Sequence, residues 1–213
     1  MATYDLEEQE QLATLKAWWN DNGNLVLTAL SLVLIAFAAW QGWNYYQRNQ
    51  AVQASALYGA VQKAAGANDL KQVRENAGAL LEQYPRTAYA AMAALVSAKA
   101  HFQGGDLKTA HAQLAWVAEN AKDEALQDLA RLRLVNVMLD EKAYDDALKA
   151  LDAKHGAAFD AQFLAARGDV LVSQGKNEEA RGAYKAALDK ADAKDAGLRG
   201  SVQLRLDALG TAK

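Results

Sequence analysis

Hydrophobic residues follow two different patterns along this chain. Between Leu25 and Trp43 they form a nearly continuous run, and no charged residue lies between positions 22 and 47. After residue 56 they recur at helical spacing and alternate with short polar segments that contain glycine. A continuous apolar run is typical of a membrane-spanning helix, whereas the spaced pattern is typical of helices that bury one face.

The apolar run has the length and the borders of a membrane anchor. Its 19 residues would rise about 28 Å as a helix, close to the roughly 30 Å of a bilayer's hydrocarbon layer. Aromatic residues, which favour the membrane–water interface, mark its two ends: Trp18 and Trp19 before it, and Trp40, Trp43, Tyr45 and Tyr46 after it. We therefore predict a transmembrane helix over residues 24–46, with Asn24 as its N-cap.

Two alternatives to a permanent anchor remain open at this point. A buried core helix seldom needs so long an apolar run flanked by aromatic residues. A cleavable secretory signal has more in its favour, because Ala36, Phe37 and Ala38 resemble a cleavage site. The residues before the run are acidic rather than basic, however, and the run continues past Ala38, so a retained single-pass anchor is favoured.

Residues 56–213 contain an internal repeat. The segments SAKAHFQGGDLKTAHAQLAWV, LVNVMLDEKAYDDALKALDA and RGDVLVSQGKNEEARGAYKAAL each read as an apolar helix, a polar turn and a second helix. Leu107, Tyr144 and Asn177 occupy the same place after each turn, 37 and 33 residues apart, and an alanine follows three positions later. A less regular unit precedes them, with Leu70 in that place. The spacing fits tetratricopeptide-type repeats of about 34 residues.

The expected fold is therefore all-α: one N-terminal transmembrane helix followed by a tetratricopeptide-like α-solenoid of helical hairpins. Small residues should let paired helices approach closely, namely Ala98, Ala110, Ala147, Gly168 and Ala180, with Leu114, Leu151 and Tyr184 filling the space beside them. Glycines in the turns, Gly66, Gly104, Gly105 and Gly175, should suit helix ends that need a left-handed backbone, and a last helix near 198–209 should cap the stack. A generic alanine-rich helical bundle is the alternative.

Catalytic and metal chemistry are poorly represented. The chain has no cysteine, which excludes disulfides, thiolate metal ligands and thiol catalysis. Its three histidines lack the i, i+4 spacing of a metal site, and no phosphate-binding glycine loop or nucleophile elbow is present. His101 stands where the repeat places a core aromatic residue, which favours a structural role. We expect no enzyme activity and no cofactor.

Charge is concentrated at the N-terminus. Residues 1–24 carry five acidic residues against Lys16, whereas acidic and basic residues balance after Asn49, so nucleic acid is not an expected partner. We divide the chain into an acidic tail (1–23), the transmembrane helix (24–46), a membrane-proximal linker helix (47–55) and the repeat domain (56–213). Flanking basic residues slightly favour a cytoplasmic repeat domain.

The combination of these segments resembles a known family. The start EEQEQLATLKAWWNDNGN, the segment WQGWNYY and the unit LAARGDVLVSQGK are similar to the YfgM-like ancillary subunit of the SecYEG translocon, over nearly the full length. The resemblance implies a single-pass protein of the bacterial inner membrane, with a cytoplasmic N-terminus and a periplasmic repeat domain. It further implies association with SecYEG and transfer of newly exported polypeptides to periplasmic chaperones, and it brings no catalytic residues. The long repeat domain can cross the membrane despite the flanking charges.

By analogy with tetratricopeptide domains, the first helix of each hairpin should line a concave binding surface. The groove residues expected on it are Lys99, Phe102, Gln103, Asn136, Leu139, Asp140, Asp169, Val172 and Ser173. Phe102, Leu139 and Val172 could instead belong to the core. The alternative function is a soluble periplasmic repeat protein, released by cleavage after Ala38 and acting in envelope or cell-division assembly.

Overall fold

The computed structural model describes residues 2–210, and the side chains of residues 8–210. Two compact units divide the chain, one up to Gln50 and one from Ala51 onward. Over the described residues the secondary structure is helical and contains no strand. The all-α prediction is therefore confirmed.

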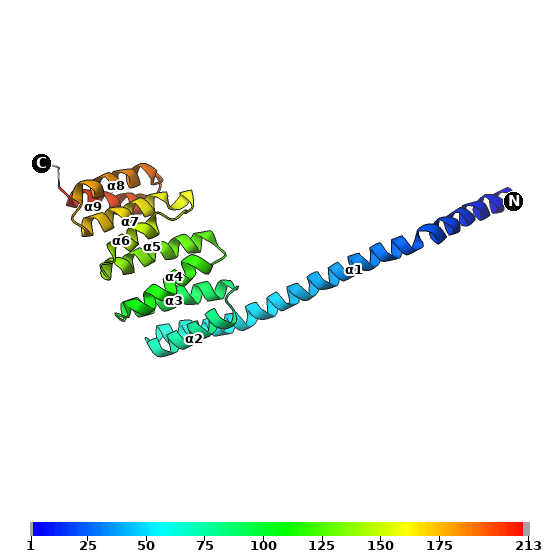
Figure 1. The fold of residues 1–213 in the computed structure, drawn as a ribbon, viewed down its shortest axis with the longest axis horizontal. Coiled ribbons are helices and arrows are strands. Elements are labelled where there is room, and N and C mark those ends of the chain that lie inside the picture. Colours follow the sequence, from blue (N-terminus) through cyan, green and yellow to red (C-terminus); the bar gives the residue numbers. More distant parts are fainter. Residues whose placement is uncertain (1, 211–213) are drawn as a thin grey trace. The chain divides into compact units, whose positions relative to one another are not determined.

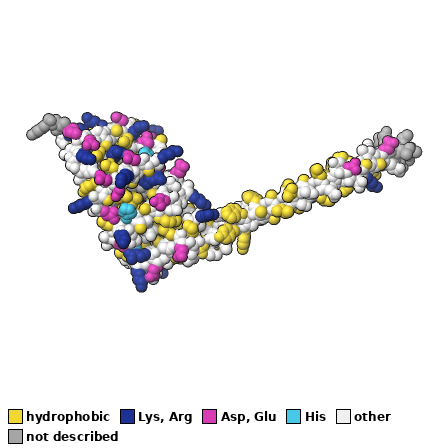
Figure 2. All heavy atoms as spheres, in the orientation of Figure 1, with side chains coloured by type: hydrophobic (Ala, Val, Ile, Leu, Met, Phe, Trp, Pro, Cys, Tyr) yellow, Lys and Arg dark blue, Asp and Glu magenta, His cyan; other side chains and the backbone are white. Residues whose placement is uncertain are grey.

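The first unit consists of helix α1, which runs from Ala2 to Gly66 and continues into the second unit (Figure 1). Within the described chain, α1 is the one helix that is long and apolar enough to cross a membrane. Figure 2 shows hydrophobic side chains along the middle of α1, with charged side chains toward its ends. A helix that exposes apolar residues in this way is suited to lipid rather than to water.

The predicted N-cap at Asn24 is wrong, because this residue lies inside α1. The residues before it are rich in Glu, Gln, Leu and Ala, which favour helix. Helical structure therefore begins well ahead of the apolar run, and no cap is needed there. The same continuity removes any break between the apolar run and residues 47–66.

Helices α2 to α8 follow one another in a stack that Figure 1 shows in chain order, and α9 lies beside α8 at its end. Their bounds are α2 Leu70–Gln83, α3 Ala88–Gln103, α4 Leu107–Asn120, α5 Glu124–Asp140, α6 Tyr144–Leu151, α7 Asp160–Ser173, α8 Asn177–Lys190 and α9 Ala196–Ala208, with a 3₁₀ turn, η1, at Ala157–Phe159. With the end of α1 they form four hairpins and a final helix. The second helices α2, α4, α6 and α8 begin at the residues that the repeat pattern singled out. The spacing of 33 residues arises because α6 and α7 are shorter than their counterparts α4 and α5, a loss that the longer connection containing η1 only partly offsets.

One turn geometry joins the two helices of every hairpin. A residue with a left-handed backbone lies two positions before each second helix: Asn68, Gly105, Lys142 and Gly175, with φ of 55°, 79°, 59° and 76°. The next backbone N–H donates to a carbonyl five residues earlier, as in Asp106 to His101 (2.8 Å). Glycine was expected here, and Gly66 was the wrong choice for the first turn, since Asn68 takes the left-handed position. Gly104 was wrong as well, because its φ is −82° and only Gly105 beside it is left-handed. Asparagine tolerates this conformation better than most residues do.

Close helix packing depends on small residues, as the repeat pattern predicted. Ala98, Ala110, Ala147 and Ala180 are buried. A Cβ atom on Gly168 of α7 would lie 2.3 Å from the ring of Tyr184 on α8, so only glycine fits there without movement. The core is divided into three clusters along the stack: one over the end of α1, α2 and α3, a large one from α3 to α7, and one over α7, α8 and α9.

Candidate peptide-docking groove

Three of the predicted groove residues occupy one repeated position. Phe102, Leu139 and Val172 are the next-to-last residues of α3, α5 and α7, each directly before the repeated turn. Phe102 is 38% exposed and Val172 37% exposed, and Leu139 is partly buried, so none of the three is a fully enclosed core residue. Phe102 and Val172 are therefore accessible from solvent at the same level of their hairpins, whereas Leu139 packs partly against the middle core cluster.

The other six predicted residues follow the same repeat. Lys99, Asn136 and Asp169 stand three positions before the apolar residue, and Gln103, Asp140 and Ser173 stand one position after it. All six are exposed except Asp169, which is partly buried. The nine residues are therefore three equivalent sets on the ends of α3, α5 and α7.

A cavity of about 320 Å³ lies between α3 and α5, with α4 contributing to its floor. Its lining residues are Leu95, Ala98, Lys99, Phe102, Leu114, Arg133, Asn136 and Val137. The structure thus brings three predicted residues together around it, Lys99, Phe102 and Asn136. The six others do not line this cavity.

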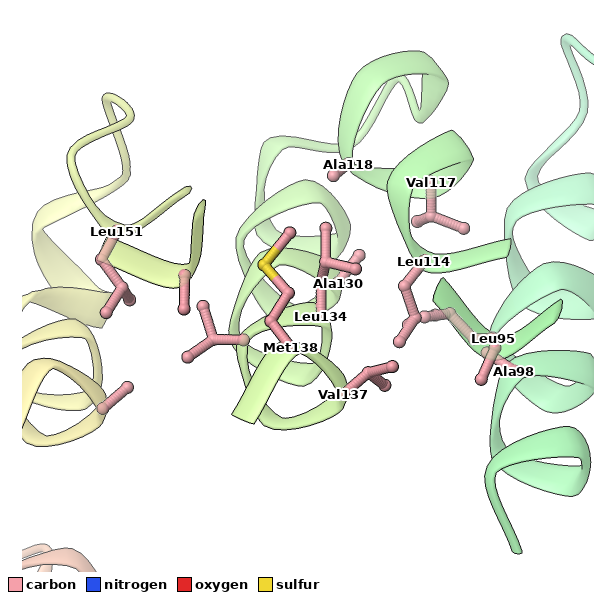
Figure 3. Close-up of a cluster of buried hydrophobic side chains, with 14 of the residues drawn as sticks. Leu95, Ala98, Leu114, Val117, Ala118, Ala130, Leu134, Val137, Met138 and Leu151 are labelled. Carbon is pink, nitrogen blue, oxygen red and sulfur yellow. The ribbon is translucent and has the colours of Figure 1, made fainter. Parts of the chain in front are cut away.

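The floor of the cavity is apolar and belongs to the middle core cluster. Figure 3 shows Leu95 and Ala98 of α3 near Leu114 of α4 and Val137 of α5. All four are buried. On α3, residues 95, 98 and 102 follow each other at spacings of three and four, which places them on one face. The small side chain of Ala98 between two larger ones leaves room for an apolar group from outside.

The rim of the cavity carries two basic residues, Lys99 on α3 and Arg133 on α5. Both are exposed. Neither forms an ion pair or a hydrogen bond with any residue whose side chain the structure describes. Asn136, also at the rim, has a free amide that can both donate and accept hydrogen bonds. An apolar floor with a polar rim of this kind suits an extended polypeptide segment.

Asp169, at the third of the equivalent positions, is held by neighbouring helices. Its Oδ1 accepts a hydrogen bond from Tyr184 Oη (2.8 Å), and its Oδ2 lies 2.9 Å from Arg205 Nη1 of α9. Burial raises the pKa of Asp169, and the Tyr184 hydrogen bond and the Arg205 charge partly counter this effect. The pKa of Tyr184 is raised as well, by burial first and then by its hydrogen bond to Asp169. This carboxylate therefore connects α7 to α8 and α9.

Sequence reasoning missed most of the cavity lining. Arg133 lies one helical turn before Asn136 on the same face of α5, so extending the predicted positions by one turn would have found it. Leu114 comes from a second helix, α4, and only the packing of α4 against α3 brings it to the floor. The repeat pattern alone carries no signal for such a contribution.

The six aromatic residues predicted at the anchor ends are all exposed on α1. The indole of Trp19 lies along Gly23, where an added Cβ would be 3.2 Å from the ring. At the other end, Tyr46 Oη accepts a hydrogen bond from Gln50 Nε2 (2.8 Å), and the rings of Trp43 and Tyr46 are 6.1 Å apart. Trp19 and Trp43 are separated by about 36 Å along the helix axis, enough to place them at opposite membrane surfaces.

The histidines serve local packing. His101 is buried, with Nδ1 3.2 Å from Asp106 Oδ2. His111 Nδ1 lies 2.8 Å from Glu141 Oε2, and the ring of His155 stacks on Phe163 at 3.9 Å. Among the described residues, no group of three or more His, Asp or Glu side chains is arranged to hold a metal ion.

Comparison with known proteins gives matches over most of the chain. A family profile described as a tetratricopeptide repeat-like domain matches residues 16–211. The chain is 34% identical to the ancillary SecYEG translocon subunit of Neisseria gonorrhoeae, over 96% of this chain and 98% of that protein. It is 30% identical to the subunit of the same name from Haemophilus influenzae, over 86% and 90%, and 29% identical to that of Escherichia coli, over 85% and 87%.

Proposed function

We propose that this chain, which belongs to the tetratricopeptide repeat-like family, is a membrane-anchored docking protein. Within that family it belongs to the ancillary SecYEG translocon subunits. In this proposal α1 holds it in the inner membrane beside SecYEG. The N-terminus is cytoplasmic, and the repeat domain lies in the periplasm. There the repeat domain receives newly exported polypeptides and passes them to periplasmic chaperones.

The observation that carries this proposal is the extent of the matches. The family profile begins at residue 16, so it includes the apolar part of α1 as well as the repeats. The Neisseria protein likewise aligns over 96% of this chain. The family profile and the Neisseria protein match the apolar helix as well as the repeat domain. This supports a helix that is retained as a membrane anchor rather than one that is removed as a signal.

Tethering accounts for function without tight binding. A domain held at the membrane meets an emerging chain at a high effective concentration, so weak contacts in an open groove suffice. Weak contacts also allow release to a second partner. The accessible apolar residues Phe102, Leu139 and Val172 provide such contacts.

Site-specific photocrosslinking in living cells tests the association. A photoreactive residue at Leu32 in α1 should crosslink to a SecYEG subunit, and one at Asn136 in the groove should crosslink to exported polypeptides or periplasmic chaperones. The same residue at Lys185, exposed on α8, is the control and should give neither product. Crosslinks from Asn136 no stronger than those from Lys185 would remove the groove from the proposal.

Topology is tested separately with introduced thiols, because the chain has no cysteine of its own. Lys185→Cys should react with a membrane-impermeant maleimide in intact spheroplasts, and Gln11→Cys only after the membrane is permeabilised. The reverse labelling pattern would place the repeat domain in the cytoplasm and overturn this part of the proposal.

The soluble alternative is tested by mass. Cleavage after Ala38 would remove about 4 kDa from the 23.0 kDa chain. We expect the full mass in the membrane fraction. A shortened chain in the soluble periplasmic fraction would favour the released form instead.

A further inference from the structure

We infer that the cavity between α3 and α5 selects polypeptide segments that combine a large apolar side chain with neighbouring acidic residues. This inference rests on the proposed docking function and narrows it, because it names the class of segment that the groove accepts. It depends on the charges around the cavity, and not on its volume alone.

The first observation is that the two basic residues at the rim are free. Five of the seven other arginines in the repeat domain are matched with carboxylates: Arg74 with Asp106, Arg131 with Asp128, Arg167 with Asp152, Arg181 with Glu178 and Arg205 with Asp169. Arg199 donates to the backbone carbonyls of Leu188 and Ala191, and Arg86 has no carboxylate partner among the described residues. Arg133 and Lys99 have no such partner among the described residues, although the domain contains as many acidic as basic side chains. Their charges are therefore available to a ligand.

The second observation is that acidic residues are absent from the cavity lining, so far as the structure describes it. Along α5, Asp128 lies five residues before Arg133, about 8 Å along the helix axis, but it is buried and paired with Arg131. Asp140 lies seven residues after Arg133, about 10 Å away along the axis. On the α3 side, Asp106 is occupied by Arg74. The cavity thus combines an apolar floor with a local excess of positive charge, which favours acidic ligands and disfavours basic ones.

The third observation concerns the shape of the ligand. A cavity of about 320 Å³ is large enough for an apolar side chain of leucine or phenylalanine size, and it is open to solvent beside Phe102. The Asn136 amide at the rim can pair with the N–H and C=O groups of an extended backbone. A bound segment would therefore bury its apolar side chain above Ala98 and place acidic side chains near Lys99 and Arg133.

Fluorescence anisotropy with the full-length protein in detergent micelles tests the inference. Three labelled peptides of equal length are compared. The first has a Leu-Phe-Leu core with two glutamates on each side, the second replaces the glutamates with lysines, and the third keeps the glutamates but replaces the core with serines. We expect the first to bind about five- to tenfold more tightly than the second at low salt, since each exposed ion pair contributes a factor of roughly 1.4 to 5. The preference should shrink as salt is raised.

Charge reversal of the rim supplies the matched control. The double variant Lys99→Glu, Arg133→Glu should lose the preference for the acidic peptide or reverse it. The double variant Lys108→Glu, Lys185→Glu changes the net charge equally on the outer helices α4 and α8 and should keep the preference.

The possible failures are distinguishable. Equal binding of the acidic and basic peptides would overturn the selectivity while leaving the docking function in place. Binding of the serine peptide as tightly as the first would show simple charge attraction and overturn the role of the apolar floor. Failure of all three peptides to bind would remove the docking groove itself.

Discussion

Leu32 in α1 and Leu204 in α9 are exposed to similar extents, 62% and 72%, yet their surroundings differ completely. Leu204 is a single apolar residue among polar ones on a helix whose opposite face packs on α8. Leu32 lies within a run of exposed apolar residues on all sides of α1. Isolated exposed leucines are normal in water, whereas a continuous exposed run indicates lipid. Exposure therefore has to be interpreted together with the solvent that surrounds each region.

The comparison predicts its largest effect for arginine substitutions at these two leucines. Leu32→Arg places a charge near the centre of the apolar run and should disfavour membrane insertion by about 3 kcal/mol. Leu204→Arg should change stability by less than about 0.5 kcal/mol. Retention in the membrane pellet after alkaline extraction measures the first, and thermal unfolding measures the second. Equal retention of both variants would show that α1 is not held in a bilayer.

Glycine-to-alanine substitutions provide a second comparison between the packed repeat domain and the exposed helix α1. Gly168→Ala forces a Cβ against the Tyr184 ring and disturbs the Tyr184–Asp169 hydrogen bond, so it should destabilise the repeat domain by about 2 kcal/mol. Gly42→Ala in α1 meets no atom within 4 Å and should leave the domain's stability unchanged. Urea unfolding followed by circular dichroism compares them. A stable Gly168→Ala variant would mean that α7 and α8 can move apart freely.

Acid should weaken the repeat domain but not α1. Burial lowers the pKa of His101, the charge of Arg74 lowers it further, and Asp106 partly opposes them. The unfolded chain therefore binds a proton at a higher pH than the folded chain does. The stability that a neutral His101 contributes is present above the ordinary histidine pKa of about 6.5 and is lost as the pH falls below it.

Thermal unfolding between pH 7.5 and pH 5 measures this effect. His101→Gln should show a smaller loss of melting temperature over this range than the unchanged protein. His111→Gln, on the partly exposed pair with Glu141, is the control. No histidine lies in residues 1–50, so the helical signal from the anchor should not follow the pH. Identical pH profiles for the unchanged protein and His101→Gln would contradict the prediction.

The smallest change in stability is expected for substitutions in the turns between the paired helices of the repeat domain. The membrane-spanning part of α1 contains no such turn. Lys142 takes a left-handed backbone that glycine adopts without strain, so Lys142→Gly should stabilise the repeat domain by about 0.5 kcal/mol. Gly105→Ala, at the equivalent position, should destabilise it by about 1 kcal/mol. Opposite shifts in the urea midpoint would confirm that the turns are equivalent. Shifts in the same direction would show that the turns at Lys142 and Gly105 are not equivalent.

Much of the fold follows from local pattern. Leu70, Leu107, Tyr144 and Asn177 mark the starts of second helices because each repeat uses the same turn. The continuous helix through Asn24 was missed, because a polar segment next to an apolar run looks like a boundary although its neighbours favour helix. Asn68 and Lys142 were missed at the turns, because the prediction considered only glycine. Other residues can also take the left-handed backbone conformation, asparagine with little strain and lysine with more.

The site was less predictable than the fold. Repeat equivalence identified Lys99, Phe102 and Asn136, since these positions recur at the ends of first helices. The floor residue Leu114 depends on how α4 packs on α3, and no spacing within one helix encodes this. Likewise, Arg205 reaches Asp169 from 36 residues away along the chain, a pairing that only the folded stack reveals.

The division of the core into three clusters affects how the molecule comes apart. The floor of the cavity between α3 and α5 belongs to the middle cluster, and α8 and α9 pack within the last one. In stacked repeats each unit depends mainly on its neighbours, so α8 and α9 at the end of the stack can detach while the helices of the middle cluster stay folded. A protease that digests the repeat domain from α9 inward would therefore remove α9 and α8 first, and the shortened fragments would still contain the cavity between α3 and α5.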